Sequence, residues 1–489
     1  MTEIAATDRA AARRLVLPLA LAQFIASYAA TNMNVAISDI AHDLDTTISA
    51  LQTTITLFTL TMAALMIPGS KLTDIWGRKR CFLLGLVVYG AGGLLATLAW
   101  GIGALMVGYS LLEGVGSALM IPPIYILITV AFDDVRTRAR YFGVVSGAAG
   151  LGAATGPLLG GFLTSALSWR ASFLGQVLVV AWVLLLARKI TDRPREGAAV
   201  PGFDVLGAVL SGAAMVCLVL GFLSTSTYGW LTASKDLDVG GRTVIPEGSL
   251  APVWWLLLAG AGLVLWFFLH VRRGERSGRE VLLRLRLFRN RTANLGLGTQ
   301  LAQWLTMQGS FFVISVFLQD ARDFSAIETG LMLTPATAGI LIAAARAERM
   351  AQRLSQRSLV VAGFACTALG MALLLALVRS DSGFWSFLPG LLLMGLGLGV
   401  MLTASVNVVQ SSFPDSDQGD ISGLSRSLSN LGSSLGVAIA GSVLVAAQTR
   451  AGHPFGVALG VLTGFALLGL LLAWLIPRDS PAGRLPDRA

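Results

Sequence analysis

The sequence predicts an all-α membrane protein with fourteen transmembrane helices. The chain has 489 residues, of which 55% are hydrophobic and only 13% are charged. That charged fraction is about half the roughly 25% usual in soluble domains, and the apolar residues fall in long blocks. This composition excludes a disordered chain, a disulfide scaffold and an ordinary soluble enzyme. Transmembrane β-strands are excluded because the apolar blocks are too long and do not alternate.

The individual spans follow from the length of the apolar runs. A helix needs about 20 mostly apolar residues to cross roughly 30 Å of hydrocarbon. The sequence contains fourteen such candidates: 15–38, 49–69, 82–100, 103–131, 141–166, 171–188, 204–224, 252–271, 293–319, 328–346, 358–378, 384–410, 421–447 and 455–476. The run at 328–346 is the weakest, because Glu328 opens it and Arg346 closes it. Twelve spanning helices with two re-entrant segments is the main alternative.

The distribution of positive charge supports this count. The net charge is +9, which in a soluble protein would suggest a nucleic acid partner. When the N-terminus is placed in the cytoplasm, most of the 36 lysines and arginines fall in cytoplasmic segments. This asymmetry follows the positive-inside rule. We therefore expect a multi-pass protein of the cell (inner) membrane, with both termini cytoplasmic and no nucleic acid partner.

The loops suggest two halves and an insert. The longest cytoplasmic loop, about 272–292, is the most basic, and the basic loop after the second span has a degenerate counterpart at 346–357. Repeated halves are the usual construction of secondary transporters. We expect an N-terminal six-helix bundle at 1–190, a two-helix insert with an outer loop and the basic cytoplasmic loop at 191–291, and a C-terminal six-helix bundle at 292–489.

The loop after the second span resembles the G-x-L-x-D-R-x-G-R-K motif of the major facilitator superfamily. The matching residues are Leu72, Asp74, Gly77, Arg78 and Lys79. An aspartate that ends a helix beside cationic side chains can form a charge–dipole latch, which holds one conformation and breaks in another. The alternative is a plain basic loop on the cytoplasmic side.

The fifth span resembles the antiporter motif G-x-x-x-G-P-x-x-G-G of the same superfamily. The matching residues are Gly152, Gly156, Pro157, Gly160 and Gly161. Small residues at four-residue spacing let two helices approach closely, and the proline can bend the helix. The resemblance implies an exporter with the major facilitator fold, here two six-helix bundles plus two extra helices.

The segment Ser168-Trp169-Arg170 with Phe173 is similar to the S-W-R-x-x-F segment of the fourteen-helix drug:proton antiporters. The chain departs from that branch at two charged positions. Ala29 stands where the family has an aspartate in the first helix, and Ser110 stands where it has an arginine in the fourth. The family's proton-coupling residues therefore cannot be carried over whole.

Glu113 is the candidate for proton coupling. It lies about ten residues into the fourth span, where an ionised carboxylate costs roughly 2.5–3.5 kcal/mol. We hypothesise that Glu113 gains and loses a proton during transport; the alternative is a neutral structural acid with one hydrogen bond. Arg426 is the other charge within a span, and we expect a structural role for it beside carboxylates such as Asp420.

Uncharged polar residues share one face in several spans, at helical spacing. We expect them to line a central substrate cavity; hydrogen bonding between helices is the alternative. The candidates are Gln23, Ser27, Thr31, Asn34, Gln52, Thr56, Gln303, Trp304, Met307 and Gln308. Uncharged polar groups beside Trp304 and Met307 indicate an amphipathic or apolar solute.

Together these features predict a secondary active exporter, not an enzyme. The expected function is multidrug efflux and antibiotic resistance: proton-coupled antiport of hydrophobic compounds, with organic cations among the candidates, by a monomer. No phosphate-binding loop, catalytic constellation or metal-ligand spacing is visible, so we expect no cofactor and no metal. The alternatives are a proton-independent or lipid-moving facilitator and, from another class, a transporter-like sensor or binding subunit.

Overall fold

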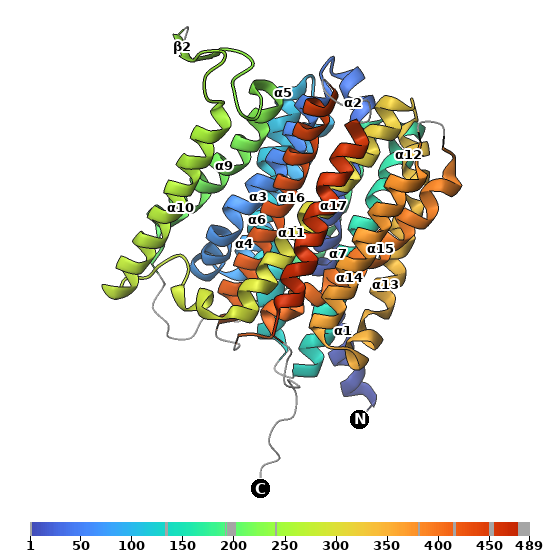
Figure 1. Cartoon of the computed structure of the whole chain (residues 1–489). Helices are drawn as coiled ribbons and strands as arrows, with labels where there is room; N and C mark the ends of the chain where they lie inside the picture. The colour runs from blue at the N-terminus through green and yellow to red at the C-terminus, as the bar shows by residue number, and fades with distance from the viewer. Residues whose placement is uncertain are drawn as a thin grey trace.

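The computed structural model describes residues 2–132, 135–190, 192, 202–239, 242–379, 382–413, 417–448 and 454–477. These residues form a bundle of long helices that run roughly parallel or antiparallel to one another (Figure 1). Within them, 12 helices are long and apolar enough to cross a membrane, and one further pair of helices passes the same test together with a bend of 46°.

The first bundle comprises the helices before the β-strands, apart from α9. Its elements are α1 (Thr2–Asn32), η1 (Met33–Val35), α2 (Ile37–Asp43), α3 (Ile48–Trp76), α4 (Arg78–Thr97), α5 (Ile102–Leu105), η2 (Met106–Glu113), α6 (Gly114–Ala131), α7 (Val135–Ala166) and α8 (Trp169–Ala187). The segments α5, η2 and α6 form one span, in which η2 is a π-helical stretch.

A helical hairpin follows the first bundle, and the second bundle comes after it. The hairpin consists of α9 (Val205–Tyr228), β1 (Leu237–Val239), β2 (Arg242–Ile245) and α10 (Pro252–Arg276), and η3 (Leu285–Arg289) follows it. The second bundle consists of α11 (Arg291–Val316), η4 (Phe317–Ala321), α12 (Ala326–Met332), α13 (Thr334–Arg353), α14 (Gln356–Leu377), α15 (Phe384–Gln410), α16 (Gln418–Gln448) and α17 (Pro454–Leu475).

The fold class expected from the sequence is confirmed, and fourteen spans are consistent with the structure. Beyond the 12 single helices and the bent pair, α7 has 32 residues, which is long enough to cross a bilayer. Its many glycines lower its hydropathy. The weak run expected at 328–346 corresponds to the bent pair α12 and α13. The bend arises because Pro335, near the start of α13, cannot donate the backbone hydrogen bond that would continue α12.

The two ends of the bundle differ in character. The turn between α3 and α4, the end of α8 and the arginine-rich segment between α10 and α11 lie at the end where α1 begins (Figure 1). We call this the basic end. The short helix α2, the start of α5 and the two-stranded antiparallel β1–β2 hairpin lie at the other end, which we call the opposite end.

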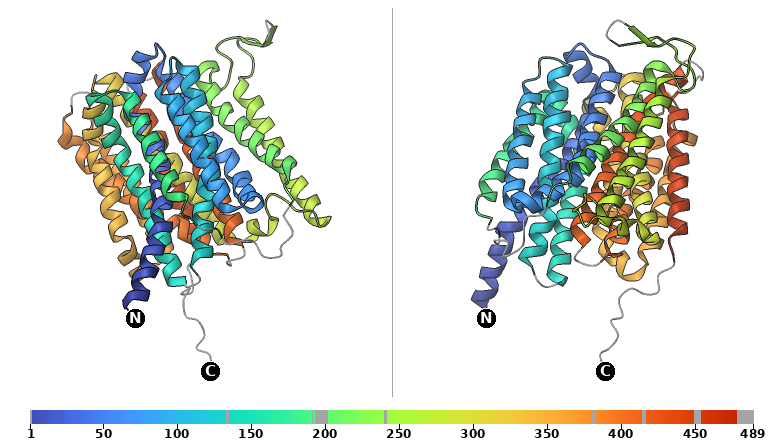
Figure 2. Two further views of the ribbon diagram at one scale, coloured as in Figure 1. Left: turned by 180° about the vertical axis from the view of Figure 1, so that it is seen from behind. Right: turned by 90° about the vertical axis from the view of Figure 1, so that its left-hand side faces the viewer.

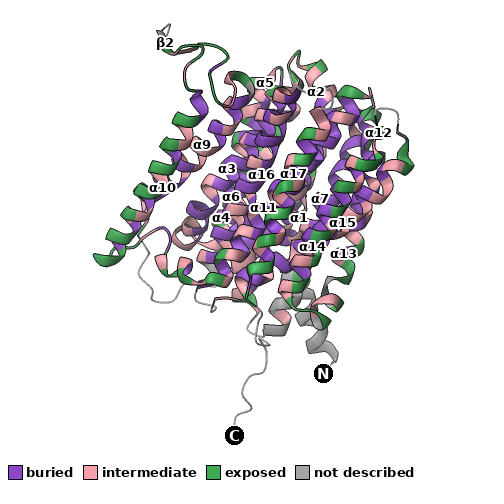
Figure 3. Ribbon diagram, viewed as in Figure 1, coloured by how far each residue is buried: buried purple, intermediate pink, exposed green. Residues whose placement is uncertain are grey.

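The α9–α10 hairpin lies against the side of the bundle (Figure 2). Val219 of α9 is buried with Ala63 of α3 and Ala438 of α16, so α9 covers the line where the two bundles meet. Much of α10 is exposed (Figure 3), and the exposed side chains are large and apolar, as Leu258 and Trp266 show. A membrane helix presents such a face to lipid.

Close approach of α7 to α1 holds the first bundle together, and the antiporter-motif glycines make it possible. A Cβ atom at Gly152 would overlap the carbonyl group of Phe24, and one at Gly156 would overlap the Thr31 side chain. Gly160 faces Asn32, where a Cβ would lie 3.0 Å from the Asn32 Cβ. The four-residue repeat therefore places one glycine per turn against α1, as expected for tight helix packing.

We predict that Gly152→Ala lowers the melting temperature of the purified protein, because the added methyl group forces α7 away from α1. Overpacking of this kind costs about 1–3 kcal/mol. Gly143→Ala is the matched control on the same helix, since no described atom outside the helix lies within 4 Å of a Cβ there. Thermal unfolding in detergent should show a loss for the first variant only, and equal melting temperatures would contradict this packing.

Candidate transport site

The two bundles meet along two seams, and the first seam is closed over its whole length. It joins α3 to α16. Near the opposite end, the Gln52 side chain donates to the carbonyl oxygens of Val437 and Ala438, both at 3.3 Å. Further along, the Thr59 and Ser434 hydroxyls lie 2.7 Å apart. At the basic end the Lys71 ammonium group lies 2.6 Å from an Asp420 carboxylate oxygen.

The second seam joins α7 to α12 and α13, and it is closed only towards the opposite end. The Thr337 hydroxyl of α13 donates to the carbonyl oxygen of Ala154 at 2.9 Å. A Cβ at Gly161 would lie 2.5 Å from the Ala326 carbonyl oxygen, so the backbones touch there. Towards the basic end the described contacts stop at two exposed glycines: a Cβ at Gly143 or Gly147 would meet no described atom of another element within 4 Å.

The central helices of the two bundles are also tied at the opposite end. Gln308 of α11 donates to the carbonyl oxygen of Ala30 at 2.9 Å. Gln319 donates to the carbonyl oxygen of Asn34 at 2.9 Å and accepts a hydrogen bond from the Ser38 amide at 3.1 Å. The structure is therefore closed at the opposite end, and the described contacts of α7 with the second bundle end before the basic end is reached.

The expected cavity residues fall into two groups. Gln23, Asn34, Thr56, Gln303 and Gln308 are buried, and each carries at least one side-chain polar atom without a hydrogen-bond partner among the described residues. Buried polar atoms normally have a partner, so water or a solute that entered this region would complete their hydrogen bonding.

The remaining expected residues serve packing or stay partly exposed. Thr31 donates to the carbonyl oxygen of its own helix at Tyr28 (3.2 Å) and packs against Gly156. Gln52 belongs to the first seam. Met307 is buried, whereas Ser27 and Trp304 are half-buried. Helix packing is thus one use of these stripes, whereas cavity lining stays a prediction.

The antiporter motif also reaches the second bundle. Gly161 contacts Ala326, and the Pro157 carbonyl oxygen would lie 2.6 Å from a Cβ at Gly330 of α12. Because Gly152, Gly156 and Gly160 face α1 while Gly161 and Pro157 face α12, the motif lies where both helices meet α7.

The loop motif closes the turn between α3 and α4. Gly77 has φ of +93°, a backbone conformation that residues with a side chain rarely adopt. The backbone amide of Lys79 donates to Asp192 at 3.1 Å, and its ammonium group donates to the Arg188 carbonyl oxygen at 3.0 Å. Arg78 lies 3.9 Å from Asp192. These contacts join the motif to the end of α8.

Leu72 and Asp74 of the same motif lie in the last turns of α3 and are half-buried. The cross-bundle ion pair found here belongs to Lys71, a position that the motif leaves unspecified. A cross-bundle ion pair therefore lies beside the motif with its cation on the first bundle, and the latch role of Asp74 stays a prediction.

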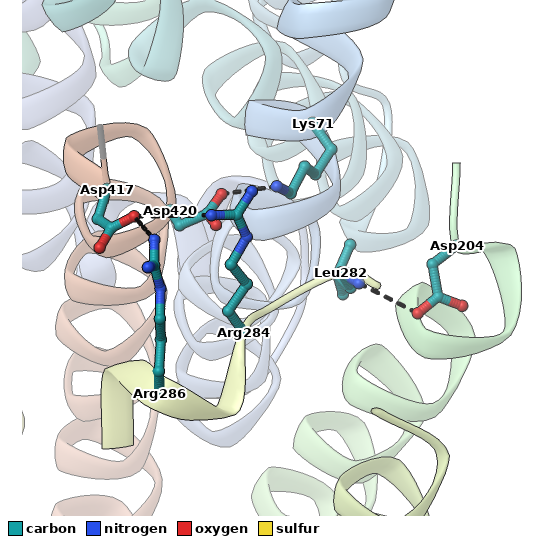
Figure 4. A network of polar contacts seen from close by, with 7 residues as sticks. All are labelled: Lys71, Asp204, Leu282, Arg284, Arg286, Asp417 and Asp420. Atoms are coloured by element: carbon teal, nitrogen blue, oxygen red, sulfur yellow. Dashed lines mark hydrogen bonds and ion pairs between the residues drawn. The ribbon is translucent and has the colours of Figure 1, made fainter. Parts of the chain in front are cut away.

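Five side chains form this latch, which we call the basic-end latch (Figure 4): Lys71, Arg284, Arg286, Asp417 and Asp420. The Arg286 guanidinium group donates to Asp417, and Arg284 lies 3.8 Å from the same carboxylate. Both carboxylates lie at the start of α16, where the helix dipole also favours negative charge. The latch thus joins three parts of the chain: α3, the start of α16, and the segment that follows α10.

Asp204 fixes the segment that carries the latch arginines (Figure 4). Its carboxylate caps α9 by accepting from the Gly207 amide at 2.8 Å. It lies 2.8 Å from His270 Nε2 of α10 and accepts from the Leu282 amide at 3.1 Å. Leu282 and Leu287 are buried against Ile67 and Ile421. The hairpin, the following segment and the first seam therefore form one connected structure.

Glu113 is buried inside the first bundle and is directed at α4, away from both seams. Its side chain is fully buried, and a Cβ at Gly93 of α4 would lie 3.1 Å from Glu113 Oε1. Neither carboxylate oxygen accepts a hydrogen bond from a described residue in this geometry, because the nearby Tyr89 hydroxyl donates its proton to Gln176. Tyr89 and Tyr109 lie close enough to interact with it electrostatically. Glu113 is the last residue of the π-helical stretch η2, a distortion that is common at functional sites.

The two positions that lack the family charges make neutral contacts. The Ser110 hydroxyl donates to the Thr54 carbonyl oxygen of α3 at 2.7 Å. The Ala29 carbonyl oxygen accepts from the Tyr109 hydroxyl at 3.0 Å. Hydrogen bonds between helices therefore occupy the places where the family has an aspartate and an arginine.

The partner of Arg426 differs from the carboxylate expected for it. Its guanidinium group donates to the Tyr125 hydroxyl of α6 and lies 5.1 Å from the centroid of that ring, whereas Asp420 pairs with Lys71. Sequence reasoning missed Tyr125, Lys71 and Asp417, because each gains its role only from a partner that is distant in the chain. The acidic start of α16 was the available signal for Asp417.

We predict that Lys71 and Asp420 are energetically coupled. Their side chains are 25% and 15% exposed, so a coupling free energy of about 0.5–1 kcal/mol is expected, near the upper end for surface pairs. A double-mutant cycle with Lys71→Ala and Asp420→Ala, read from thermal unfolding, measures it.

The matched control is the cycle of Arg273→Ala with Asp420→Ala, since Arg273 is an exposed arginine on α10. Its effects should be additive. If the Lys71 cycle were also additive, the ion pair would contribute nothing to the latch.

Comparisons with known proteins agree with this architecture. Residues 19–288 and 296–489 match the Major Facilitator Superfamily. The chain is 30% identical to the "Probable actinorhodin transporter" of Streptomyces coelicolor over 84% of this chain and 69% of that protein. It is 29% identical to the "Tetracenomycin C resistance and export protein" of Streptomyces glaucescens, over 88% of this chain and 76% of that one.

Two further similarities cover more of the chain. The chain is 28% identical to the "Puromycin resistance protein pur8" of Streptomyces alboniger over 94% of this chain and 90% of the relative. The crystal structure of the human organic anion transporter MFSD10 has the same fold, with a TM-score of 0.60 at 16% identity over 94% of this chain and 99% of that chain. The chain belongs to the major facilitator superfamily, a family of multi-pass membrane transporters.

Proposed function

We propose that this protein exports small hydrophobic compounds, organic cations among them, by alternating access. The observation that carries the proposal is the inequality of the two seams. Contacts at the opposite end close the path between the bundles there, whereas α7 loses its contacts with the second bundle towards the basic end. A carrier that admits a solute from one side at a time requires such an arrangement.

The names of the relatives support export as the direction of transport. Three of the relatives named above are described as transport, resistance or export proteins for actinorhodin, tetracenomycin C and puromycin. The buried, unpaired groups of Gln23, Gln303 and Gln308, together with the half-buried Trp304, suit a solute with a large apolar body and few polar groups. We therefore assign the chain to multidrug or antibiotic efflux.

Proton exchange is the drive that we assign to this export, with Glu113 as the carrier. A fully buried carboxyl group without a hydrogen-bond partner is costly when ionised, so its charge state responds to small changes in its surroundings. Exchange of one proton for one monovalent organic cation is electroneutral. A gradient of two pH units then supplies about 2.7 kcal/mol, enough for roughly 100-fold accumulation.

The orientation follows from the charges. The basic end faces the cytoplasm under the positive-inside rule, so the structure is open towards the cytoplasm and α1 begins there. We place the protein in the cell membrane as a monomer with both termini cytoplasmic. The segments 1–190 and 292–489 would be the two moving bundles, and 191–291 the insert between them.

A proton-independent or lipid-moving facilitator is the second candidate. The specific observation in its favour is that Ala29 and Ser110 replace the two charged residues of the antiporter branch and make neutral contacts instead. A transporter-like sensor would need neither the basic-end latch nor a seam that opens.

We predict that the purified protein in proteoliposomes accumulates ethidium only when a pH gradient is imposed. Glu113→Gln should lower gradient-driven accumulation by at least about tenfold, because the amide cannot carry a proton. The variant should keep its affinity for ethidium, measured by fluorescence anisotropy, since Glu113 faces away from the seams.

The control is Glu328→Gln, which changes an exposed acid at the start of α12 and leaves its capping position polar. This variant should transport as the wild type does. Gradient-independent flux in the wild type would favour the facilitator, and binding without flux would favour the sensor. Full proton-driven transport by Glu113→Gln would remove Glu113 from the mechanism.

A further inference from the structure

The segment of α8 that begins with Ser168-Trp169-Arg170 has no role in the seams. Its polar side chains instead share one face that points into the first bundle. Trp169, Ser172 and Gln176 follow at intervals of three and four residues, which places them on one side of the helix. All three are buried, although α8 also has a broad apolar face with exposed Leu178 and Trp182.

The first contacts of this face lie at the surface of the opposite end. Trp169 Nε1 donates to Asp43 at 3.1 Å, and the Arg170 guanidinium group donates to the same carboxylate. The hydrogen bond from Arg170 holds the pKa of the Asp43 carboxyl below its usual range. Asp43 therefore stays ionised at neutral pH, and its side chain is 44% exposed to water.

One turn deeper, Ser172 connects α8 to the end of α1. Its hydroxyl lies 2.6 Å from the Tyr28 hydroxyl and accepts from Asn32 Nδ2 at 2.8 Å. Asn32 Oδ1 is buried and has no partner among the described residues. Buried polar atoms in this state normally bind ordered water.

The next turn brings the face to Glu113. The Tyr89 hydroxyl of α4 donates to Gln176 Oε1 at 2.7 Å, and Tyr89 interacts electrostatically with Glu113. Gln176 Nε2 is buried without a described partner, and so are both Glu113 oxygens. By helical rise, Gln176 lies about 10 Å along α8 from Trp169. The unpaired atoms thus extend from the opposite end to the buried acid.

We propose that this face of α8 is the route by which protons reach Glu113 from the opposite end, separate from the solute path between the bundles. The proposal rests on the carrier role of Glu113 given above. A proton leaves a hydronium ion at the surface, passes by exchange of O–H bonds along bound water and the Ser172 and Tyr89 hydroxyls, and ends on a Glu113 carboxylate oxygen. The Asn32 and Gln176 amides keep their protons and hold the water in place.

The groups that surround Glu113 favour this route over one through the seams. The titratable groups that interact with Glu113 are Tyr89 on α4 and Tyr109 on its own span. The α3 helix meets this span through Phe58 and Thr61, which pack against Gly114 and carry no ionisable group. On the α8 side, Gln176 adds a buried hydrogen-bonding side chain next to Tyr89, and its amide nitrogen has no partner among the described residues.

The test compares two tyrosines that are equally buried beside Glu113. Tyr89→Phe removes the hydroxyl that joins Gln176 to the acid, whereas Tyr109→Phe removes one that donates to the backbone at Ala29. In proteoliposomes, Tyr89→Phe should lower gradient-driven ethidium accumulation by about tenfold or more, and Tyr109→Phe by less than about twofold. Ethidium counterflow without a gradient should be unchanged in both.

A second pair of variants, at Gln176, distinguishes loss of the proton route from structural damage. Gln176→Leu should behave as Tyr89→Phe does, and Gln176→Asn, which restores an amide, should recover most of the driven rate. Loss of counterflow along with driven transport in Tyr89→Phe would assign it a structural role and overturn the route. Normal driven transport in Tyr89→Phe and Gln176→Leu, with Glu113→Gln inactive, would overturn the route and leave the carrier intact. Normal driven transport in Glu113→Gln would overturn both.

Discussion

The contact between α3 and α16 is the constraint on which the rest of the structure depends. It joins the two bundles along their whole length, from the Gln52 side chain to the Lys71–Asp420 pair, and α9 covers it on the side. Because this seam is continuous, the difference between the two ends appears at the other seam. There a Cβ at Gly150 of α7 would lie 3.9 Å from Leu402 of α15, whereas one at Gly147 would meet no described atom of another element within 4 Å. Gly152 and Gly156 let α7 pack closely against α1, whereas Gly143 and Gly147, nearer the basic end, contact no other described element.

Glu113 is coupled to this seam through its own helix. The span that carries it bonds to α3 through Ser110 and Thr54, and Gly114 packs against Thr61 of α3. A change of charge at a fully buried carboxyl group alters the packing around it, because the low-dielectric interior must supply new hydrogen bonds or water. That change in packing would be transmitted to α3 through these contacts, although Glu113 itself does not reach the solute path.

The sequence predicted the architecture well because its signals are local. Apolar runs and the asymmetry of basic residues depend only on the bilayer, and they identified the spans, the weak one at 328–346 included. The glycine motif predicted close helix packing correctly for the same reason. The side-chain partners could not be predicted from the sequence. Lys71 meets Asp420, and Arg426 meets Tyr125, only because helices distant in the chain pack together. Glu113 also ends a π-helical stretch, a local distortion that residue patterns do not predict.

The proposed antiport by alternating access requires that the proton on Glu113 decides which end of the second seam is open. Spin labels at Gly147 and Arg346 report on the basic end of that seam, and labels at the exposed Leu167 and Leu331 report on the opposite end. Pulsed electron resonance across a pH titration measures both distances. The account predicts that they change in opposite directions as Glu113 loses its proton, and that Glu113→Gln holds both at their low-pH values. Distances that do not respond to pH, or that respond equally in Glu113→Gln, would contradict it.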